Sequence, residues 1–412
     1  MSCLVSKAQL EVKELKLSNG MTVWLNEDHS QPKVFGAVVV KAGAKDCPNT
    51  GIAHYFEHIM FKGTDRISTI DYQAEKPWLD SISAQYDLLS QTHDEAERTK
   101  IQQHINELSL KASDYVIPNE FNRLISKYGG SGLNAGTGYD ETFYYNSFLP
   151  QYMEQWCWLN SERLISPVFR GFQGELENVY EEKNRSADGM GNAMEKVMGA
   201  VFKTQPYAYP IIGSTENLKN PRLSDMAAFY KKYYVASNMG LILCGDITPD
   251  STLTALLEQT FGRVQTGTAP KRGYSPMPNI QPNEKYEVKL PIPLIGIEAL
   301  VFKAPTDFEP DADALDLANA LLSNGKAPAR QSSFELPVLA MSPQRATAST
   351  PLSRKKAKAS SRYLGYSSLT WTSLITPKTR FSLRGSLAPK TANEERRTTT
   401  RKYECFEVML GL

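Results

Sequence analysis

The spacing of apolar and polar residues predicts the strands of one sheet in the first part of the chain. Residues 12–17 and 21–25 flank Asn19-Gly20, a dipeptide typical of a type I′ turn between two strands. Residues 34–40 are continuously apolar, which predicts a central strand buried on both faces. Two more strands are expected over residues 141–148 and 239–244, where aromatic and aliphatic residues cluster.

Other segments repeat their apolar residues every three or four positions, as helices do. Residues 68–115 show this pattern twice, on either side of the capping sequence Thr92-His93-Asp94-Glu95, which predicts an antiparallel helical hairpin inserted into the domain. Shorter helices are expected over residues 50–62, 150–165, 192–202, 224–234 and 249–261. The mixture of strands and helices predicts the α+β fold class.

The pattern changes after the first domain, which we assign to residues 1–267. A proline-rich linker over residues 268–283 precedes the start of a second domain at 284–326, with strands at 286–290 and 294–302 and a helix at 312–322. In residues 327–412 the hydrophobic periodicity largely disappears and Ser and Thr make up about a quarter of the residues. This tail is expected to be disordered or to result from a shifted reading frame, and the alternative is a basic arm for acidic partners.

Charge is divided unevenly along the chain. The net charge is +1, but the tail has 15 Lys and Arg against 5 Asp and Glu, which gives +10 and leaves −9 for the first 326 residues. The acidic body has no aromatic residues interleaved with basic ones for base stacking, so nucleic-acid binding is not expected.

Composition indicates a globular chain, with 41% hydrophobic and 22% charged residues. No apolar run approaches membrane-spanning length. The apolar patch at the start of the chain is far too short for the core of a signal peptide, which predicts a cytoplasmic protein, or an exported one if the true start lies upstream. The five cysteines are scattered and are expected to be free thiols, with Cys157 and Cys244 buried.

A metal-binding pattern lies in the segment predicted as the first helix. His54 and His58 are four residues apart, so a helix would point both imidazoles to the same side. Glu57 lies on the flank of that face, where its carboxylate could act as a general base. Gly51 and Gly63 flank the segment, as expected for a helix with defined ends.

Two histidines are only part of a catalytic zinc site, which normally has three protein ligands. A carboxylate from the acidic helix predicted around residues 175–185 is the available third ligand, although such a helix alone would be an ordinary solvated face. The glycine-rich residues 129–132 lead into a strand with small residues at 133–137. This strand could receive another backbone at a sheet edge, or it could follow an ordinary glycine loop.

Taken together, these motifs resemble the pitrilysin and insulinase family of zinc metallopeptidases, over about residues 8–325. The most specific motif is the inverted His-x-x-Glu-His sequence at residues 54–58, followed by Met60-Phe61-Lys62-Gly63-Thr64. The supporting motifs are Glu175-x6-Glu182, Asn134-Ala135, residues 229–234 and Gly245-Asp246.

The resemblance implies roles for individual residues. Glu182 would be the third zinc ligand beside His54 and His58, and Glu175 would support the site from behind. Asn134 and Ala135 would begin the edge strand that receives the substrate backbone. The two zinc motifs are farther apart in this sequence than is usual in the family, by about the length of the helical hairpin. Such hairpins occur in a bacterial branch of the family.

The implied fold is a series of pitrilysin-type α/β domains, each a sheet with helices on one face, and the second domain of this chain is truncated or altered. The implied activity is zinc-dependent endopeptidase cleavage of extended peptides, with one zinc ion per chain and Glu57 activating water. The alternative is a non-catalytic or impaired subunit of a processing or peptide-binding complex, because the family's substrate-holding arginine and tyrosine of the second domain are missing. A second half-molecule is expected, as a homodimer or a paired subunit.

Overall fold

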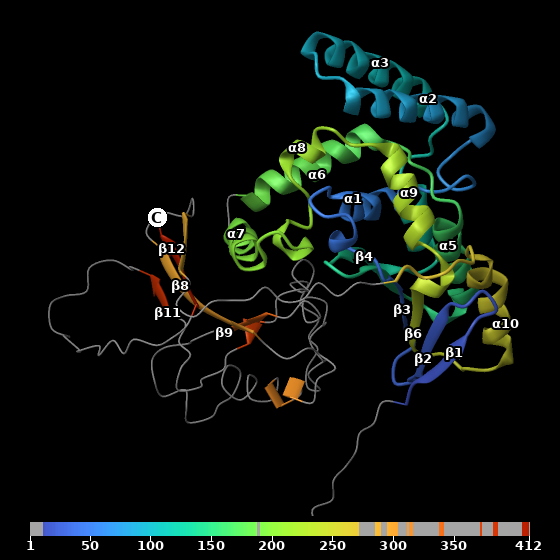
Figure 1. Ribbon diagram of the computed structural model, residues 1–412. Coiled ribbons are helices and arrows are strands. Elements are labelled where there is room, and N and C mark those ends of the chain that lie inside the picture. Colours follow the sequence, from blue (N-terminus) through green and yellow to red (C-terminus); the bar gives the residue numbers. More distant parts are fainter. Residues whose placement is uncertain are drawn as a thin grey trace, which may run out of the picture. The chain divides into compact units, whose positions relative to one another are not determined.

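The computed structural model describes residues 11–187 and 190–271, and after them only short segments between residues 285 and 411 (Figure 1). Contacts divide the chain into two units: residues 1–179 with 211–272, and residues 180–210 with 273–412. Helix α6 (Phe172–Ala187) is continuous across this division, with its first half in the first unit.

The first unit contains an open sheet of six strands in the order β1-β2-β6-β3-β5-β4. Neighbouring strands are antiparallel except β2 and β6, which are parallel. The strand predicted as central, β3, does lie inside the sheet, and β4 forms one edge. The strands are β1 (Lys13–Lys16), β2 (Thr22–Glu27), β3 (Val34–Val40), β4 (Ser131–Thr137), β5 (Thr142–Phe148) and β6 (Met239–Gly245).

Helix α5 (Met153–Ile165) packs on this sheet through Trp156. A Cβ atom on Gly36 of β3 would lie 2.3 Å from the indole ring, so glycine is needed for the ring to lie this close to the strand. The indole stacks on Phe148 with ring centroids 4.9 Å apart, and its Nε1 donates to Asn146 Oδ1 at 2.8 Å. The buried indole therefore has its polar atom satisfied.

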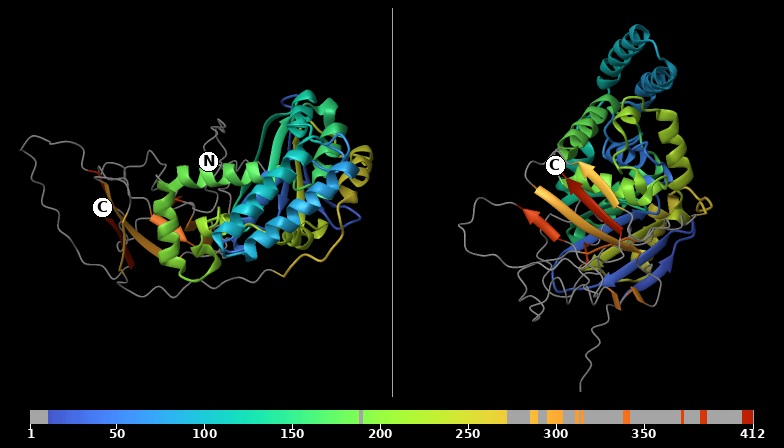
Figure 2. Two further views of the ribbon diagram at one scale, coloured as in Figure 1. Left: turned by 90° about the horizontal axis from the view of Figure 1, so that it is seen from above. Right: turned by 60° about the vertical axis from the view of Figure 1, so that its left-hand side comes forward.

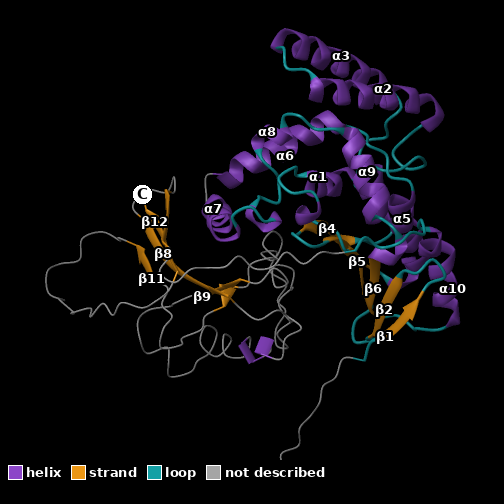
Figure 3. Ribbon diagram, in the orientation of Figure 1, coloured by secondary structure: helices purple, strands orange, loops and turns teal. Residues whose placement is uncertain are grey.

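Several other helices of the first unit gather on the same side of the sheet, as the purple ribbons around α1, α5 and α9 show (Figure 3). These are α1 (Ile52–Ile59), α4 (Glu120–Lys127), α8 (Thr215–Leu218), α9 (Leu223–Tyr233) and α10 (Ser251–Thr260). Within the described residues, no helix is long and apolar enough to cross a membrane.

The segment 68–115 holds two long helices, α2 (Tyr72–Gln91) and α3 (Glu95–Ser113), which pack against each other along their length (Figure 2). Asp94 caps α3 by accepting from the Glu97 amide at 2.9 Å. The two ends of the segment are joined where the Ile70 amide donates to the Tyr115 carbonyl at 2.8 Å. The hairpin expected from the sequence thus has a closed base.

Two local expectations are wrong, and one helix was not expected. Helix α1 ends at Ile59 rather than near residue 62. The Asn19-Gly20 turn is not of type I′, because that type needs positive φ at both residues and only Gly20 has it, at +93°. The Asn19 side chain is instead used in tertiary contacts, since its Nδ2 donates to the carbonyls of Phe261 and Val264. Helix α4 was not expected, and only two of its residues are buried.

The described cysteines differ in their burial. Cys157 is buried as expected, but Cys244 is only partly buried. It lies on the face of β6 opposite to the buried Leu241 and Leu243, and its Sγ donates to Asn26 Oδ1 at 3.0 Å. Cys47, Cys157 and Cys244 are free thiols, and the other two cysteines lie outside the described residues.

The described strands of the second unit form a sheet in the order β10-β9-β8-β12-β7, with β11 also paired to β8. Strands β7 and β8 begin and end within one residue of the strands expected at 286–290 and 294–302. Of the helix expected at 312–322, only residues 312, 314 and 315 are described, and these are helical. Most of the linker and most of the tail 327–412 lie outside the described residues. The strands are β7 (Lys285–Lys289), β8 (Ile295–Lys303), β9 (Val338–Met341), β10 (Trp371–Thr372), β11 (Ser382–Gly385) and β12 (Phe406–Gly411).

Candidate metal centre

Helix α1 carries the two histidines and begins directly after Gly51. This glycine has φ of +74°, which a residue with a side chain rarely adopts, and a Cβ atom here would lie 2.3 Å from the Ile212 carbonyl oxygen. Glycine therefore allows the start of α1 to lie against the segment around Ile212. The buried side of α1 includes Phe56, whose ring contacts the Tyr234 ring edge-on at 4.8 Å.

The imidazoles of His54 and His58 lie side by side, with ring centroids 4.8 Å apart. Each of these histidines and Glu182 of α6 offers one ligand atom, and the three atoms lie within 4.8 Å of one another. Both histidines are half-buried, whereas Glu182 is exposed. Two imidazoles and one carboxylate form a donor set used by catalytic zinc sites, so these residues fit a zinc ion.

Glu175 lies seven residues before Glu182, about two turns earlier on the same side of α6. Its Oε2 lies 3.1 Å from His58 Nδ1, and its Oε1 is paired with Lys62 and accepts from Asn178 Nδ2 at 3.1 Å. Burial opposes ionisation of this carboxyl, but the hydrogen bonds from His58 and Lys62 outweigh it and lower the pKa of Glu175 to about 2.

This carboxylate determines which nitrogen of His58 carries the proton. An ionised carboxylate can only accept, so Nδ1 must donate to Glu175 and Nε2 keeps its lone pair for a metal. Burial, followed by repulsion from His58, lowers the pKa of His54 to about 3. His54 is thus kept in the neutral form that binds metals at neutral pH.

Glu57 lies next to His58 and is 8% exposed. The Thr137 hydroxyl, at the end of β4, donates to Glu57 Oε2 at 2.7 Å. The strand that borders the sheet therefore positions the candidate general base of α1.

Asn134 and Ala135 both lie on β4, opposite Tyr145 and Tyr144 of β5. Asn134 is exposed and Ala135 is buried, and α1 packs against this strand. The sheet order leaves the other side of β4 without a partner strand among the described residues. The residues expected to receive a substrate backbone are thus on an edge strand beside α1.

The roles of Thr137, Lys62 and Asn178 were not predicted from the sequence. Lys62 lies in the sequence motif that contains the two histidines, and Asn178 lies three residues after Glu175, within the second motif. Both residues were therefore close to motifs that the sequence revealed. Thr137 is 80 residues from Glu57, and nothing in its local sequence indicates the contact.

The fold and this cluster define the class: an α+β protein in which two imidazoles and one carboxylate could hold a metal ion. A model of the family described as insulinase (peptidase family M16) matches residues 22–76, and one described as peptidase M16 inactive domain matches residues 222–361. The chain belongs to this pitrilysin and insulinase family, as its sequence predicted.

Curated relatives carry peptidase names at low identity. An uncharacterized zinc protease of Rickettsia felis is 23% identical over 257 residues, which cover 61% of this chain and 50% of the relative. The mitochondrial-processing peptidase subunit beta of Blastocladiella emersonii is 22% identical over 260 residues, covering 61% of this chain and 44% of that subunit. The chain thus spans about half the length of these relatives.

Solved structures share the fold. A protease from Helicobacter pylori has a TM-score of 0.60 at 20% identity, with 79% of this chain and 68% of that chain covered. Pitrilysin has a TM-score of 0.56 at 18% identity, with 81% of this chain and 32% of that chain covered. The pitrilysin-type α+β fold predicted from the sequence is therefore correct.

Proposed function

We propose that this chain is a zinc-dependent endopeptidase that hydrolyses peptide bonds of extended peptides and holds one zinc ion. His54, His58 and Glu182 would bind the ion, and Glu175 would orient His58 from behind. The names of relatives such as the Rickettsia felis zinc protease support zinc as the metal.

The observation that carries the proposal is the placement of Glu57 on the same helix as His54 and His58, with its carboxylate fixed by Thr137. When bound, a zinc ion in such a site lowers the pKa of a coordinated water and polarises a carbonyl oxygen. Glu57 would accept the proton of the attacking water and deliver it to the leaving amine, a role typical of a positioned carboxylate.

The edge strand β4 supports extended peptides as substrates. A peptide that pairs with β4 at Asn134 and Ala135 would add a strand to the sheet and lie beside α1. Folded proteins offer few free segments for such pairing, so unfolded or flexible chains are the proposed substrate class.

The test is zinc content and cleavage of a fluorogenic peptide, measured on the parent, on Glu57→Gln and on Glu107→Gln, a control on the exposed side of α3. We expect about one zinc in all three, and a loss of cleavage of at least about 100-fold in Glu57→Gln alone, because general acid–base catalysis contributes about that much or more. A parent that takes up no zinc would refute the proposal.

The alternative is a non-catalytic or impaired subunit of a larger complex. Two observations favour it: the match to a peptidase M16 inactive domain, and a relative whose name makes it one subunit of a processing peptidase. Zinc uptake by the parent without peptide cleavage would support this alternative. Light scattering would then test whether the chain associates with a second copy, the proposed second half-molecule.

A further inference from the structure

A cavity of about 360 Å³ lies at the base of the helical hairpin, within the first unit. One wall comes from α2 and α3, and another from residues 169–174, which lead into α6. Most of the lining is apolar, contributed by Phe61, Leu79, Ile82, Val116, Phe169 and Phe172. Its volume is within the range of natural sites for small molecules.

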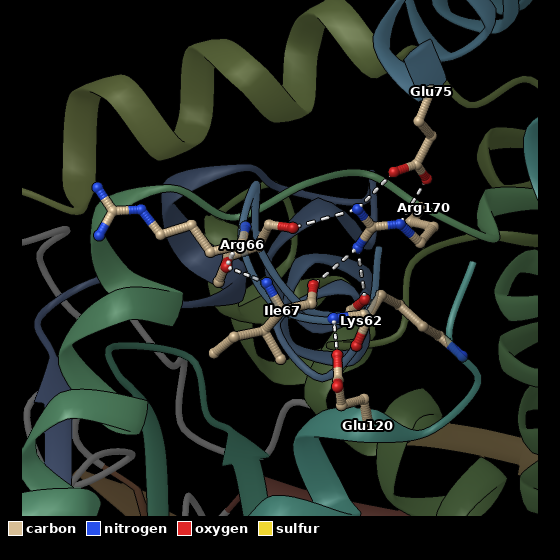
Figure 4. Close-up of polar contacts among 8 residues, drawn as sticks. Lys62, Arg66, Ile67, Glu75, Glu120 and Arg170 are labelled. Carbon is tan, nitrogen blue, oxygen red and sulfur yellow. Dashed lines mark hydrogen bonds and ion pairs between the residues drawn. The ribbon is translucent and has the colours of Figure 1, made fainter. Parts of the chain in front are cut away.

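The charged groups of the wall are already neutralised. Arg170 pairs with Glu75 through two hydrogen bonds, of 2.5 Å from Nε and 2.8 Å from Nη2. Its other donors reach the carbonyls of Lys62, Thr64 and Ile67, as the dashed lines around the guanidinium show (Figure 4). Lys62 also lines the cavity and is paired with Glu175. The cavity therefore has no charge to offer an ionic ligand from these residues.

One polar group of the wall lacks a partner. Ser68 lines the cavity and is 3% exposed, and its Oγ makes no hydrogen bond to any residue that the structure describes. Its backbone is fixed elsewhere, since the amide donates to Glu120 Oε2 at 2.5 Å. A buried hydroxyl without a partner is costly, so a bound molecule that pairs with it would gain affinity.

We propose that this cavity binds a small, neutral, largely apolar molecule that carries one hydroxyl or carbonyl group for Ser68. The apolar walls would bury the body of the molecule, and the single unpartnered hydroxyl would orient it. An anionic ligand is disfavoured because the donors of Arg170 are all in use.

Occupancy of the cavity would also act on the metal centre, an extension that rests on the proposed function. Phe172, Gln173 and Gly174 line the cavity, and Glu175 follows them directly on α6. Lys62, which also lines the cavity, is paired with the Glu175 carboxylate, which holds His58. A ligand that shifts this wall would therefore change zinc affinity, and zinc would change ligand affinity by the same factor.

The experiment measures binding of 2-naphthol by its fluorescence, with naphthalene as a probe that lacks the hydroxyl. Ser109→Trp places a large ring at the cavity from α3, and Gln103→Trp places it on the exposed side of the same helix. Ser68→Gly removes the Oγ at a position with φ of +69°, which glycine adopts without strain. Thermal unfolding checks that each variant is folded.

We expect Ser109→Trp to weaken 2-naphthol binding at least tenfold and Gln103→Trp to leave it unchanged. Ser68→Gly should weaken 2-naphthol about two- to tenfold, the contribution of one neutral hydrogen bond, and leave naphthalene unaffected. Absent binding at millimolar 2-naphthol, or binding that Ser109→Trp does not weaken in a folded protein, would overturn the site.

The coupling has its own readout, the affinity of 2-naphthol with and without zinc. A difference of about fivefold or more is expected. Equal affinities would overturn the coupling and leave the cavity site in place. A chain that takes up no zinc but binds 2-naphthol would refute the proposed function, and the coupling with it, but not the site.

Discussion

The buried ion pair between Arg170 and Glu75 offers a sharp test of what attaches the hairpin to the domain. Glu75 lies in the first turn of α2 and its side chain is fully buried, while that of Arg170 is 3% exposed. Figure 4 shows the guanidinium between the Glu75 carboxylate and the carbonyls that follow α1. The perturbation is Glu75→Gln, which keeps the shape of the side chain and removes its charge.

We expect this substitution to cost about 3 kcal/mol of unfolding free energy. Removing one partner of a buried pair typically costs about 3–5 kcal/mol, because the remaining charge stays buried. The lower end applies here, since glutamine can still accept one hydrogen bond and three carbonyls continue to accept from Arg170. For a domain of this size the melting temperature would fall by roughly 6–12 °C.

The assay is urea unfolding of the metal-free chain, so that metal binding adds nothing to stability. The matched control is Asp80→Asn on the same helix, which breaks the Lys76–Asp80 pair of similar length, 2.6 Å, at an exposed site. Exposed pairs four residues apart contribute only about 0.3–0.5 kcal/mol. Equal losses in Glu75→Gln and Asp80→Asn would refute the reasoning.

Two further predictions concern the metal centre. The pKa values of His54 and Glu175 lie near 3 and 2, below their ordinary 6.5 and 4.5, so the unfolded chain binds more protons than the folded one as the pH falls. Stability of the metal-free chain should therefore fall below pH 6.5 through His54 and further below pH 4.5 through Glu175, each by at most about 1.4 kcal/mol per pH unit. Urea unfolding at pH 7, 6 and 5 should show that the unfolding free energy of His54→Gln changes less with pH than that of the parent. His104→Gln, at an exposed site, is the control and should match the parent. A pH dependence in His54→Gln equal to that of the parent would contradict this prediction. Gly51→Ala should lower the unfolding free energy by at least about 2 kcal/mol more than Gly132→Ala does. Both glycines have positive φ, but a Cβ added at Gly51 would lie 2.3 Å from a backbone oxygen, whereas one added at Gly132 would have no atom within 4 Å. Equal unfolding free energies of the two variants would count against the steric account.

Much of the fold of the first unit could be predicted from local patterns. The local sequence is enough to predict β3, from its apolar run, and α2 and α3, from their helical periodicity. The turn at Asn19 could not be predicted, because its geometry depends on carbonyls more than 240 residues away. Local preference is overridden where a tertiary contact fixes the same side chain.

The candidate site, too, has a part that the sequence predicts and a part that depends on tertiary contacts. His54, Glu57 and His58 are neighbours on one helix, so spacing alone places them together. The Thr137 contact to Glu57 and the Lys62 contact to Glu175 join elements far apart in the chain, and no spacing rule encodes them. The sequence thus predicts which groups could bind a metal, and tertiary structure determines what orients them.

The hairpin and the metal centre share one support, the residue that begins α6. The Phe172 ring lies between Tyr86 of α2 and Tyr55 of α1, with centroids 4.6 Å away in each case. Tyr55 donates to the Phe172 carbonyl, and Tyr86 donates to the Gln173 side chain. Because close-packed side chains transmit small displacements, the position of α2 affects the helix that carries Glu175 and Glu182. The hairpin therefore separates the two metal motifs along the sequence while helping to hold them together in space.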